Sequence, residues 1–303
     1  MTGPVRDLVG YGRRPPVVRW PGDARVAVSI VVNYEEGSER SFDRDGVNEG
    51  LGEVPRRVDG PYRDLATESV YEYGSRAGVH RLLRLFDKYG IACTFFAAAE
   101  ALEANPAVCE AIRGGEHEVC AHGWRWSEEW LAGVDAQRDA IARAVRSIET
   151  TCGRRPVGWY SRWMPSVDTR RLLVEEGGFR YDSNAYNDDL PYFVDVAGTP
   201  FLVVPYSLTF NDSRHVYGQF TSAGDFFEEC RRGFDYLWEE GGETPRMMSI
   251  GVHPRLIGQP SRTSALRDFI DHVLARGGGW FARRRDIADL WWEQPFRPGR
   301  ASS

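Results

Sequence analysis

Side chains that could take part in chemistry stand at the ends of four short apolar runs in this sequence. Glu35 and Glu36 come directly after the run 26–34, and His122 and His253 close two later runs. The fourth run ends at Tyr160. A carboxylate and a histidine held together can act as general base and general acid. One such pair is weak evidence for a catalytic site, and the position that all of them share is the informative observation.

The apolar runs alternate with amphipathic segments along the whole chain. Most runs are continuously apolar, which is typical of parallel strands buried on both faces. The segments between them carry apolar residues at helical spacing and give way to glycine. We therefore predict an α/β fold, a single irregular (β/α) barrel of about seven to eight parallel strands that spans residues 1–303 as one domain. The runs with strand character are 26–34, 93–98, 118–122, 157–160, 181–183, 201–206, 248–253 and 280–282.

The segment 37–68 has no periodic pattern and is rich in glycine, arginine and aspartate. We predict that it is a long loop insertion after the first strand. The carboxyl ends of parallel barrel strands meet at one mouth, where active sites of such barrels lie. The insertion is therefore expected to form a lid or a contact between subunits, and the strand-end residues are expected to gather beneath it.

Composition and charge exclude several classes of protein. The 303 residues include 38 basic and 44 acidic side chains, for a net charge of −6, and the basic residues are scattered. This argues against a nucleic-acid partner. No run of about 18 apolar residues and no apolar leader is present, so we expect a cytoplasmic protein without a membrane partner. We also expect a homo-oligomer, with the aromatic surplus and the 37–68 insertion as candidate contacts.

The five cysteines are widely spaced, and none forms a C-x-x-C pair. Their number and spacing indicate neither a disulfide framework nor a zinc knuckle. Cys93 and Cys120 lie within apolar runs, where buried and chemically inert thiols are expected.

Seven motifs in chain order resemble the polysaccharide deacetylase (NodB-homology) family, and in particular its metal-independent allantoinase branch. The resemblance implies a deacetylase-like barrel. It places Glu35 and Glu36 where the family has paired aspartates, and His122 at the family's first metal histidine. His253 stands at the histidine that protonates the leaving nitrogen. The motifs are RDLVGYG at 6–12, NYEEG at 33–37, YGSRAG at 73–78, HGWRW at 122–126, GWY at 158–160, EEGGF at 175–179 and RLIG at 255–258.

One departure from the family pattern bears on the metal. Deacetylases have a second histidine ligand four residues after the first, and here that position is Trp126. A catalytic zinc normally needs three protein ligands, and an indole supplies none. We therefore predict that no metal or other cofactor takes part. A single divalent metal such as zinc is the alternative.

Without a Lewis acid, an unactivated acetamide is a poor target for hydrolysis. A cyclic amide or ureide is a better one, because its leaving nitrogen belongs to an electron-poor conjugated system. The resemblance and this argument together predict a hydrolase of C–N bonds that opens a ring such as allantoin, giving allantoate. The alternatives are a metal-dependent polysaccharide or peptidoglycan N-deacetylase and a barrel that binds ligands without catalysis.

The resemblance also suggests roles for individual residues. Glu36 or Glu35 would activate water, and His253 would be the general acid. His122 would orient the reacting groups or stabilise the oxyanion, and Arg76 is expected to share this role. The remaining substrate-binding candidates form a flat slot or donate hydrogen bonds at the mouth; they are Trp126, Trp159, Tyr160, Arg162, Asp182 and Asn211.

Overall fold

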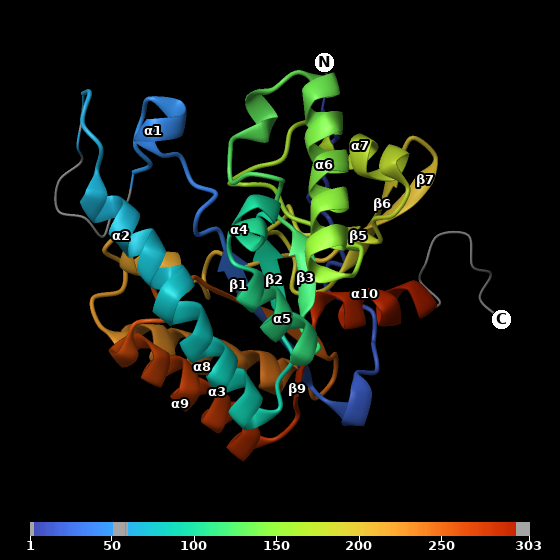
Figure 1. The fold of residues 1–303 in the computed structure, drawn as a ribbon. Coiled ribbons are helices and arrows are strands. Elements are labelled where there is room, and N and C mark those ends of the chain that lie inside the picture. Colours follow the sequence, from blue (N-terminus) through green and yellow to red (C-terminus); the bar gives the residue numbers. More distant parts are fainter. Residues whose placement is uncertain (1–2, 51–57, 59, 295–303) are drawn as a thin grey trace.

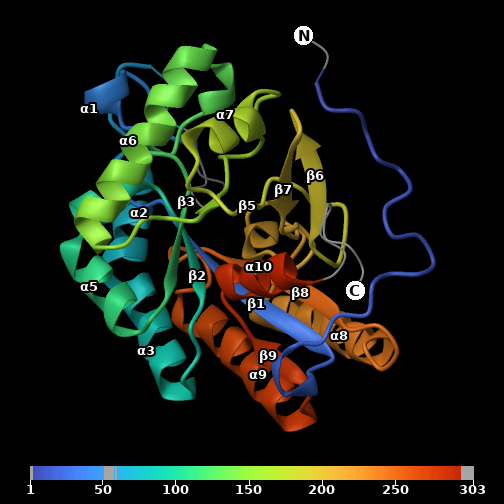
Figure 2. The same cartoon turned by 90° about the vertical axis from the view of Figure 1, so that its right-hand side faces the viewer.

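The fold is built on one mostly parallel sheet of nine strands, which the computed structural model shows for residues 3–50, 58 and 60–294. The strand order is β6-β7-β5-β4-β3-β2-β1-β8, with β9 beside the start of β1. The sheet curls, and helices cover its outer face (Figures 1 and 2). The strands are β1 Val26–Tyr34, β2 Thr94–Ala97, β3 Glu118–Ala121, β4 Gly158–Trp159, β5 Tyr181–Asp182, β6 Tyr192–Val196, β7 Thr199–Val203, β8 Arg246–Val252 and β9 Gly279–Phe281.

The predicted α/β architecture with a parallel sheet is confirmed. All nine residues of β1 are buried, as its continuous apolar pattern predicts, and β1 pairs in parallel with β2, β8 and β9. The sequence pattern did not indicate β6, which pairs with β7 in the antiparallel direction. Every residue of β6 is at least partly exposed, so it lacks the continuous apolar run by which the other strands were identified.

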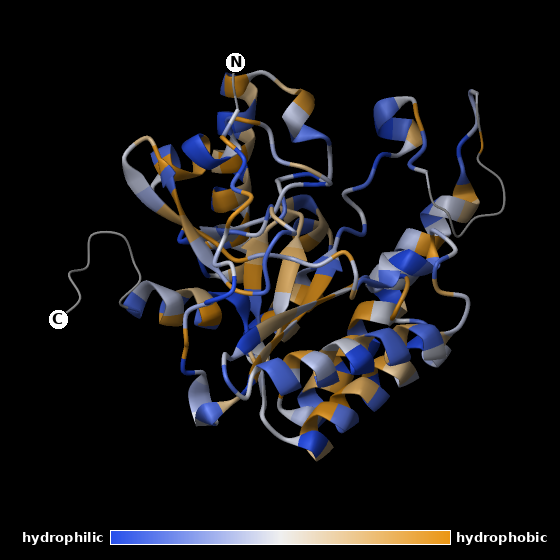
Figure 3. Ribbon diagram, turned by 180° about the vertical axis from the view of Figure 1, so that it is seen from behind, coloured by the Kyte–Doolittle hydropathy of each residue, from blue (hydrophilic) through white to orange (hydrophobic). Residues whose placement is uncertain are grey.

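Ten α-helices follow or precede the strands in the described part of the chain. In α3, Val79, Leu82, Leu83 and Phe86 are buried on one face, and the helix ends at Gly90, whose φ of 63° suits glycine. The helices carry hydrophobic and hydrophilic residues side by side (Figure 3), as expected for elements with one face on a core. The helices are α1 Phe42–Asp45, α2 Leu65–Tyr73, α3 Val79–Tyr89, α4 Ala99–Ala104, α5 Pro106–Gly114, α6 Val134–Cys152, α7 Thr169–Glu176, α8 Ala223–Glu240, α9 Pro260–Arg276 and α10 Arg284–Glu293.

The insertion predicted at 37–68 is not a loop throughout. It contains the short helix α1 and the first residues of α2, and α2 runs through one π-helical turn, Gly74–Gly78, into α3. Figure 1 shows this stretch as a single long rod. Asp64 caps α2 by accepting a hydrogen bond from the Thr67 N–H, a local signal that the aperiodic pattern concealed. Residues 51–57 and 59 of the insertion lie outside the described residues.

A buried guanidinium joins strands of the sheet that do not pair with one another. Arg284, at the start of α10, is fully buried. It donates to Ser183 Oγ after β5 (2.9 Å), to Ser249 Oγ in β8 (2.6 Å) and to the carbonyls of Val204 and Pro205 after β7. One side chain therefore connects β8 with the β5–β7 part of the sheet.

Within the described residues, no helix combines the length and apolar character needed to cross a membrane. The five cysteines are free and buried there, and the burial predicted for Cys93 and Cys120 is confirmed.

Candidate active site

The strand-end residues singled out in the sequence meet at one edge of the sheet. Glu35 and Glu36 follow β1, His122 follows β3 and His253 follows β8. All four are buried, and the most exposed, His253, retains 8% of its accessible surface. Burial in a medium of low dielectric strengthens the electrostatic interactions among them.

Both histidines direct a ring nitrogen at the same carboxylate oxygen. His122 Nε2 lies 3.4 Å from Glu35 Oε1, and His253 Nε2 lies 3.8 Å from that atom. The other oxygen of Glu35 accepts a hydrogen bond from Arg255 Nη1 at 2.8 Å. Glu35 is therefore the centre of the cluster, with two imidazoles on one oxygen and a guanidinium on the other.

The second nitrogen of each imidazole fixes the orientation of its ring. His122 Nδ1 lies 2.8 Å from the carbonyl oxygen of Tyr160, which can only accept, so this nitrogen carries a proton. His253 Nδ1 lies 2.6 Å from Asp212 Oδ1. The other oxygen of Asp212 accepts the N–H groups of His253 (2.8 Å) and Ile257 (3.0 Å). Both rings are thereby turned so that Nε2 faces Glu35.

The charges around Glu35 and His253 move their pKa values apart. Burial alone would raise the pKa of Glu35, but Arg255, His253 and the hydrogen bond from His122 outweigh it and hold the pKa well below its usual value. Burial alone would lower the pKa of His253, but the carboxylates of Asp212 and Glu35 raise it. The cluster therefore favours an ionised carboxylate beside a protonated imidazole.

Glu36 occupies a different environment from its neighbour. It accepts the backbone N–H groups of Glu35 (3.1 Å) and Arg255 (3.3 Å), and its side chain is fully buried against Gly74. A Cβ at position 74 would collide with the Glu36 side chain, so glycine there lets the carboxylate lie against the helix without shifting. Burial raises the pKa of Glu36 to about 7, and the charge of Glu35 adds to this while Arg255 opposes it. Glu36 thus holds the Arg255 backbone in place beneath the cluster.

Two aromatic rings flank the cluster. The Tyr160 ring is stacked on His122 with 5.0 Å between centroids. Trp126 is buried and lies with its ring 3.6 Å from the guanidinium carbon of Arg162. Arg162 also donates to the Trp126 carbonyl (2.6 Å) and pairs with Glu49 at 2.8 Å. The structure therefore places Tyr160 and Trp126 beside the cluster, with Arg162 against the Trp126 ring, and their binding of substrate stays a prediction.

Four predicted substrate-binding residues are engaged elsewhere. The Arg76 side chain is 78% exposed and pairs with Glu72 on the helix surface, because residue 76 lies inside a continuous helix and not at a helix start facing the mouth. Trp159 is a core residue, packed edge-on against Phe179. The other two have local partners: the Asp182 oxygens accept from Arg170 and from the Asn184 N–H, and Asn211 caps a 3-10 turn while donating to Tyr206.

The segment after Glu36 is tied by ion pairs to the loops that follow β3 and β4. Arg125 pairs with Asp45 and donates to the Ser38 carbonyl, and Arg162 pairs with Glu49. These contacts hold residues 38–49 beside the cluster. The predicted lid position of the insertion is consistent with this arrangement.

Comparisons with known proteins place this geometry in a family. A family model described as polysaccharide deacetylase matches residues 65–173. A putative polysaccharide deacetylase of Schizosaccharomyces pombe is 36% identical over 313 residues, covering 95% of this chain and 97% of that protein. The chain belongs to the polysaccharide deacetylase family. A peptidoglycan deacetylase of Helicobacter pylori is 30% identical, over 72% of this chain and 84% of that protein.

Two solved structures are similar to this deacetylase-family enzyme in sequence and in fold. A probable polysaccharide deacetylase of Pseudomonas aeruginosa PAO1 is 45% identical with a TM-score of 0.91, covering 96% of this chain and 99% of that one. The PuuE allantoinase is 44% identical with the same TM-score, over 96% and 98% of the two chains. The predicted resemblance to the family and to its allantoinase branch is confirmed.

The residues of this family member do not fit a zinc centre. Trp126 stands where deacetylases have their second histidine ligand, and its indole offers no lone pair to a metal. The Arg255 guanidinium lies 2.8 Å from Glu35 and 3.7 Å from Glu36, so a cation already neutralises the carboxylates. Among the residues that the structure describes, no group of three or more His, Cys, Asp or Glu side chains is arranged to hold a metal ion.

The roles of two residues at the site were not predicted from the sequence. Asp212 orients His253, a role that the sequence did not indicate, although its neighbour Asn211 was a substrate-binding candidate. Arg255 pairs with Glu35 from two residues beyond His253. The signals were present in part, since Arg255 opens the RLIG motif and Asp212 follows Asn211, but neither residue ends an apolar run.

Proposed function

We propose that this enzyme opens the ring of a cyclic amide or ureide, such as allantoin. Water attacks the ring carbonyl with the help of a general base and a general acid, and no metal takes part. The observation that carries the proposal is the convergence of two imidazole Nε2 atoms on Glu35 Oε1, with Arg255 on the other oxygen. The cluster supplies a base, an acid and positive charge within one buried space, which are the groups that hydrolysis of a C–N bond needs.

Glu35 is the general base in this proposal. Its Oε1 is the atom that both histidines face, whereas both oxygens of Glu36 accept backbone N–H groups. Glu35 takes a proton from water as the water oxygen attacks the ring carbonyl carbon. Arg255 keeps Glu35 ionised in the free enzyme, and movement of this guanidinium toward the developing oxyanion would restore basicity to the carboxylate.

His253 is the general acid. Asp212 accepts its Nδ1 proton and raises its pKa, so Nε2 carries a proton that can be delivered. When the tetrahedral intermediate collapses, the ring C–N bond breaks and the nitrogen takes this proton. The products are a carboxylate and an open-chain amide or urea.

Arg255 stabilises the oxyanion, and His122 orients the reacting groups. The backbone carbonyl of Tyr160 fixes the His122 ring, and Arg255 reaches the cluster from the opposite side. A preorganised donor such as the Arg255 guanidinium is worth about 3 kcal/mol in the transition state.

The chemistry of the cluster favours a ring substrate. A hydantoin-type ring has an electron-poor leaving nitrogen, which compensates for the lack of a strong Lewis acid. Its planar shape suits a site bordered by the Tyr160 and Trp126 rings. The 44% identity to the PuuE allantoinase supports this substrate class.

The test is to incubate the purified chain with allantoin, hydantoin and cyclic imides and to follow ring opening by proton NMR. The measurements are made with and without prior chelation. We expect turnover of at least one ring substrate that chelation leaves unchanged, and a Glu35→Gln variant slower by about 100- to 10,000-fold. Arg76→Gln is the matched control, because that side chain lies on the surface. Turnover that chelation abolishes would contradict the metal-free proposal.

A metal-dependent N-deacetylase is the second candidate. It is favoured by His122, which stands at the family's first metal histidine, and by the names of the S. pombe and H. pylori relatives. Release of acetate from chitin or peptidoglycan fragments in the presence of zinc, with no ring opening, would support this candidate instead.

A further inference from the structure

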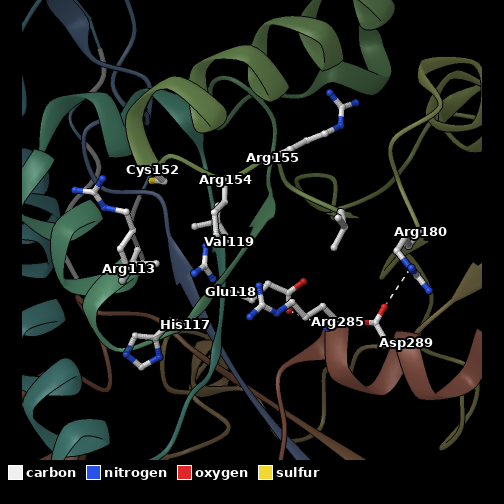
Figure 4. A pocket seen from close by; sticks show the side chains of 12 residues that line it. Arg113, His117, Glu118, Val119, Cys152, Arg154, Arg155, Arg180, Arg285 and Asp289 are labelled. Carbon is white, nitrogen blue, oxygen red and sulfur yellow. Dashed lines mark hydrogen bonds and ion pairs between the residues drawn. The ribbon is translucent and has the colours of Figure 1, made fainter.

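A hollow of about 310 Å³ lies at the opposite end of the sheet from the candidate active site. It borders Glu118, the first residue of β3, whereas His122 follows the last residue of that strand. Its walls come from the ends of α5 and α6, the residue before β5, and α10 (Figure 4). None of the residues proposed for catalysis borders it, so it is a separate feature of the molecule.

The hollow is strongly basic in a chain of net negative charge. Five arginines and two carboxylates, Glu118 and Asp289, line it, which leaves a formal charge of +3 in a protein of net charge −6. A local excess of one sign in a concave site attracts ligands of the opposite sign. The arginines are Arg113, Arg154, Arg155, Arg180 and Arg285.

The two carboxylates neutralise little of this charge. Asp289 pairs with Arg180 at 3.1 Å, on one side of the hollow (Figure 4). The oxygens of Glu118 are occupied by the Tyr181 hydroxyl, the Thr94 hydroxyl and the Arg285 backbone N–H. Burial also raises the pKa of Glu118 above its usual value.

Two of the arginines have no acidic partner. Over residues 3–50, 58 and 60–294, no carboxylate forms an ion pair with Arg113 or Arg154. Arg155 is held by Glu176 outside the lining. Arg113 and Arg154 are exposed residues at the ends of neighbouring helices, so their guanidinium groups are free to meet a ligand.

The remaining lining is apolar except for one histidine. Ile112, Val119 and Val157 contribute hydrocarbon surface. His117 accepts the Cys93 N–H at Nδ1 (3.1 Å), so the neutral ring carries its proton at Nε2. Burial, and the charge of Arg283, lower the pKa of His117 to about 4, so the ring is neutral at pH 7. Its buried Nε2 has no hydrogen-bond partner among the described residues.

We infer that this hollow binds a small anion with two or three negative charges, carried by phosphate or carboxylate groups on a compact body. The planar guanidinium fork matches both kinds of oxyanion in a bidentate manner. A volume of about 310 Å³ lies at the small end of ligand pockets, which suits a metabolite and not a polymer.

The experiment is a calorimetric titration of the full chain with inorganic pyrophosphate and, separately, with citrate. We expect saturable one-to-one binding of at least one of them. Arg113→Gln and Arg154→Gln should each weaken it about tenfold, the effect of losing one charged hydrogen-bond donor. Tighter binding of pyrophosphate identifies a phosphorylated ligand, and tighter binding of citrate a polycarboxylate.

The matched control is Arg267→Gln, an exposed arginine on α9 that pairs with Asp268. It should leave the affinity unchanged. Nitrogen-15 NMR of His117 gives a second readout, because binding beside the ring should shift its Nε2 resonance. Absence of saturable binding of either anion would overturn the inference, as would equal weakening by Arg267→Gln and Arg154→Gln.

Discussion

His253 and Asp212 are joined at 2.6 Å between Nδ1 and Oδ1, although 41 residues separate them in the chain. Asp212 stands at the start of a 3-10 turn, and His253 follows β8. The same carboxylate binds the backbone N–H of His253 and of Ile257, so it holds both the ring and the loop that carries it. The proposed general acid therefore has a fixed direction before any substrate arrives.

Replacing Asp212 should change the pH dependence of the reaction. Asp212 raises the pKa of His253, and the acid form of His253 is the active one, so activity falls as the pH rises through that pKa. In Asp212→Asn the pKa drops and the basic limb of the kcat profile should move to lower pH. We also expect kcat to fall by about 100-fold or more at neutral pH. A variant with lower kcat but an unmoved basic limb would mean that Asp212 only supports the loop.

Glu36 should affect stability more than chemistry. Its pKa is raised from 4.5 in the unfolded chain to about 7 in the folded protein. As the pH rises, the unfolded chain therefore releases the Glu36 proton at a lower pH than the folded protein does. The free energy of unfolding falls between about pH 4.5 and about pH 7 as a result. Glu36→Gln removes this loss, which amounts to roughly 3 kcal/mol above pH 7.

Urea unfolding of both proteins between pH 5 and pH 8 measures the Glu36 effect. The variant should be the more stable one at high pH, with the difference shrinking toward pH 5. A loss of kcat from Glu36→Gln as large as that from Glu35→Gln would instead make Glu36 the base.

Arg255 should control the acidic limb of the profile of kcat against pH. Its guanidinium lowers the pKa of Glu35, and the ionised carboxylate is the active form. Arg255→Gln therefore shifts the acidic limb to higher pH and lowers kcat through the lost oxyanion partner, by about 100-fold or more. Rate measurements from pH 4 to pH 9 check this, with Arg76→Gln as the surface arginine control. An unmoved acidic limb would show that Arg255 does not set the basicity of Glu35.

Arg284 should be required for stability and not for the chemical step. Its guanidinium satisfies the carbonyls of Val204 and Pro205 and two serine hydroxyls in a fully buried position. Arg284→Met leaves these groups unpaired, which costs about 1–3 kcal/mol for each buried acceptor. We expect a lower midpoint in thermal unfolding, whereas Arg267→Met on the surface should stay within about 0.5 kcal/mol of the parent. Equal stability of both variants would contradict this role.

Apolar patterning was sufficient to predict most of the sheet and the position of its chemistry. Glu35, His122 and His253 were identified because each stands where a buried run ends, and parallel strands bring those ends together. The predictions that Arg76 and Trp159 bind the substrate were wrong for a related reason. Trp159 lies within a strand-end motif but its side chain packs into the core, and Arg76 belongs to a helix whose continuity the glycine-rich motif concealed.

The sequence by itself therefore determined the parallel α/β architecture, the edge of the sheet that carries the site, and the loss of a family metal ligand at Trp126. Only the tertiary structure decided that Glu35 and not Glu36 faces both histidines. The direction of each side chain depends on partners far along the chain: Asp212 orients the His253 ring, and Arg255 binds the Glu35 carboxylate from 220 residues away. Local patterning reports whether a side chain is buried, whereas the atom that it meets depends on how separate strands and loops pack.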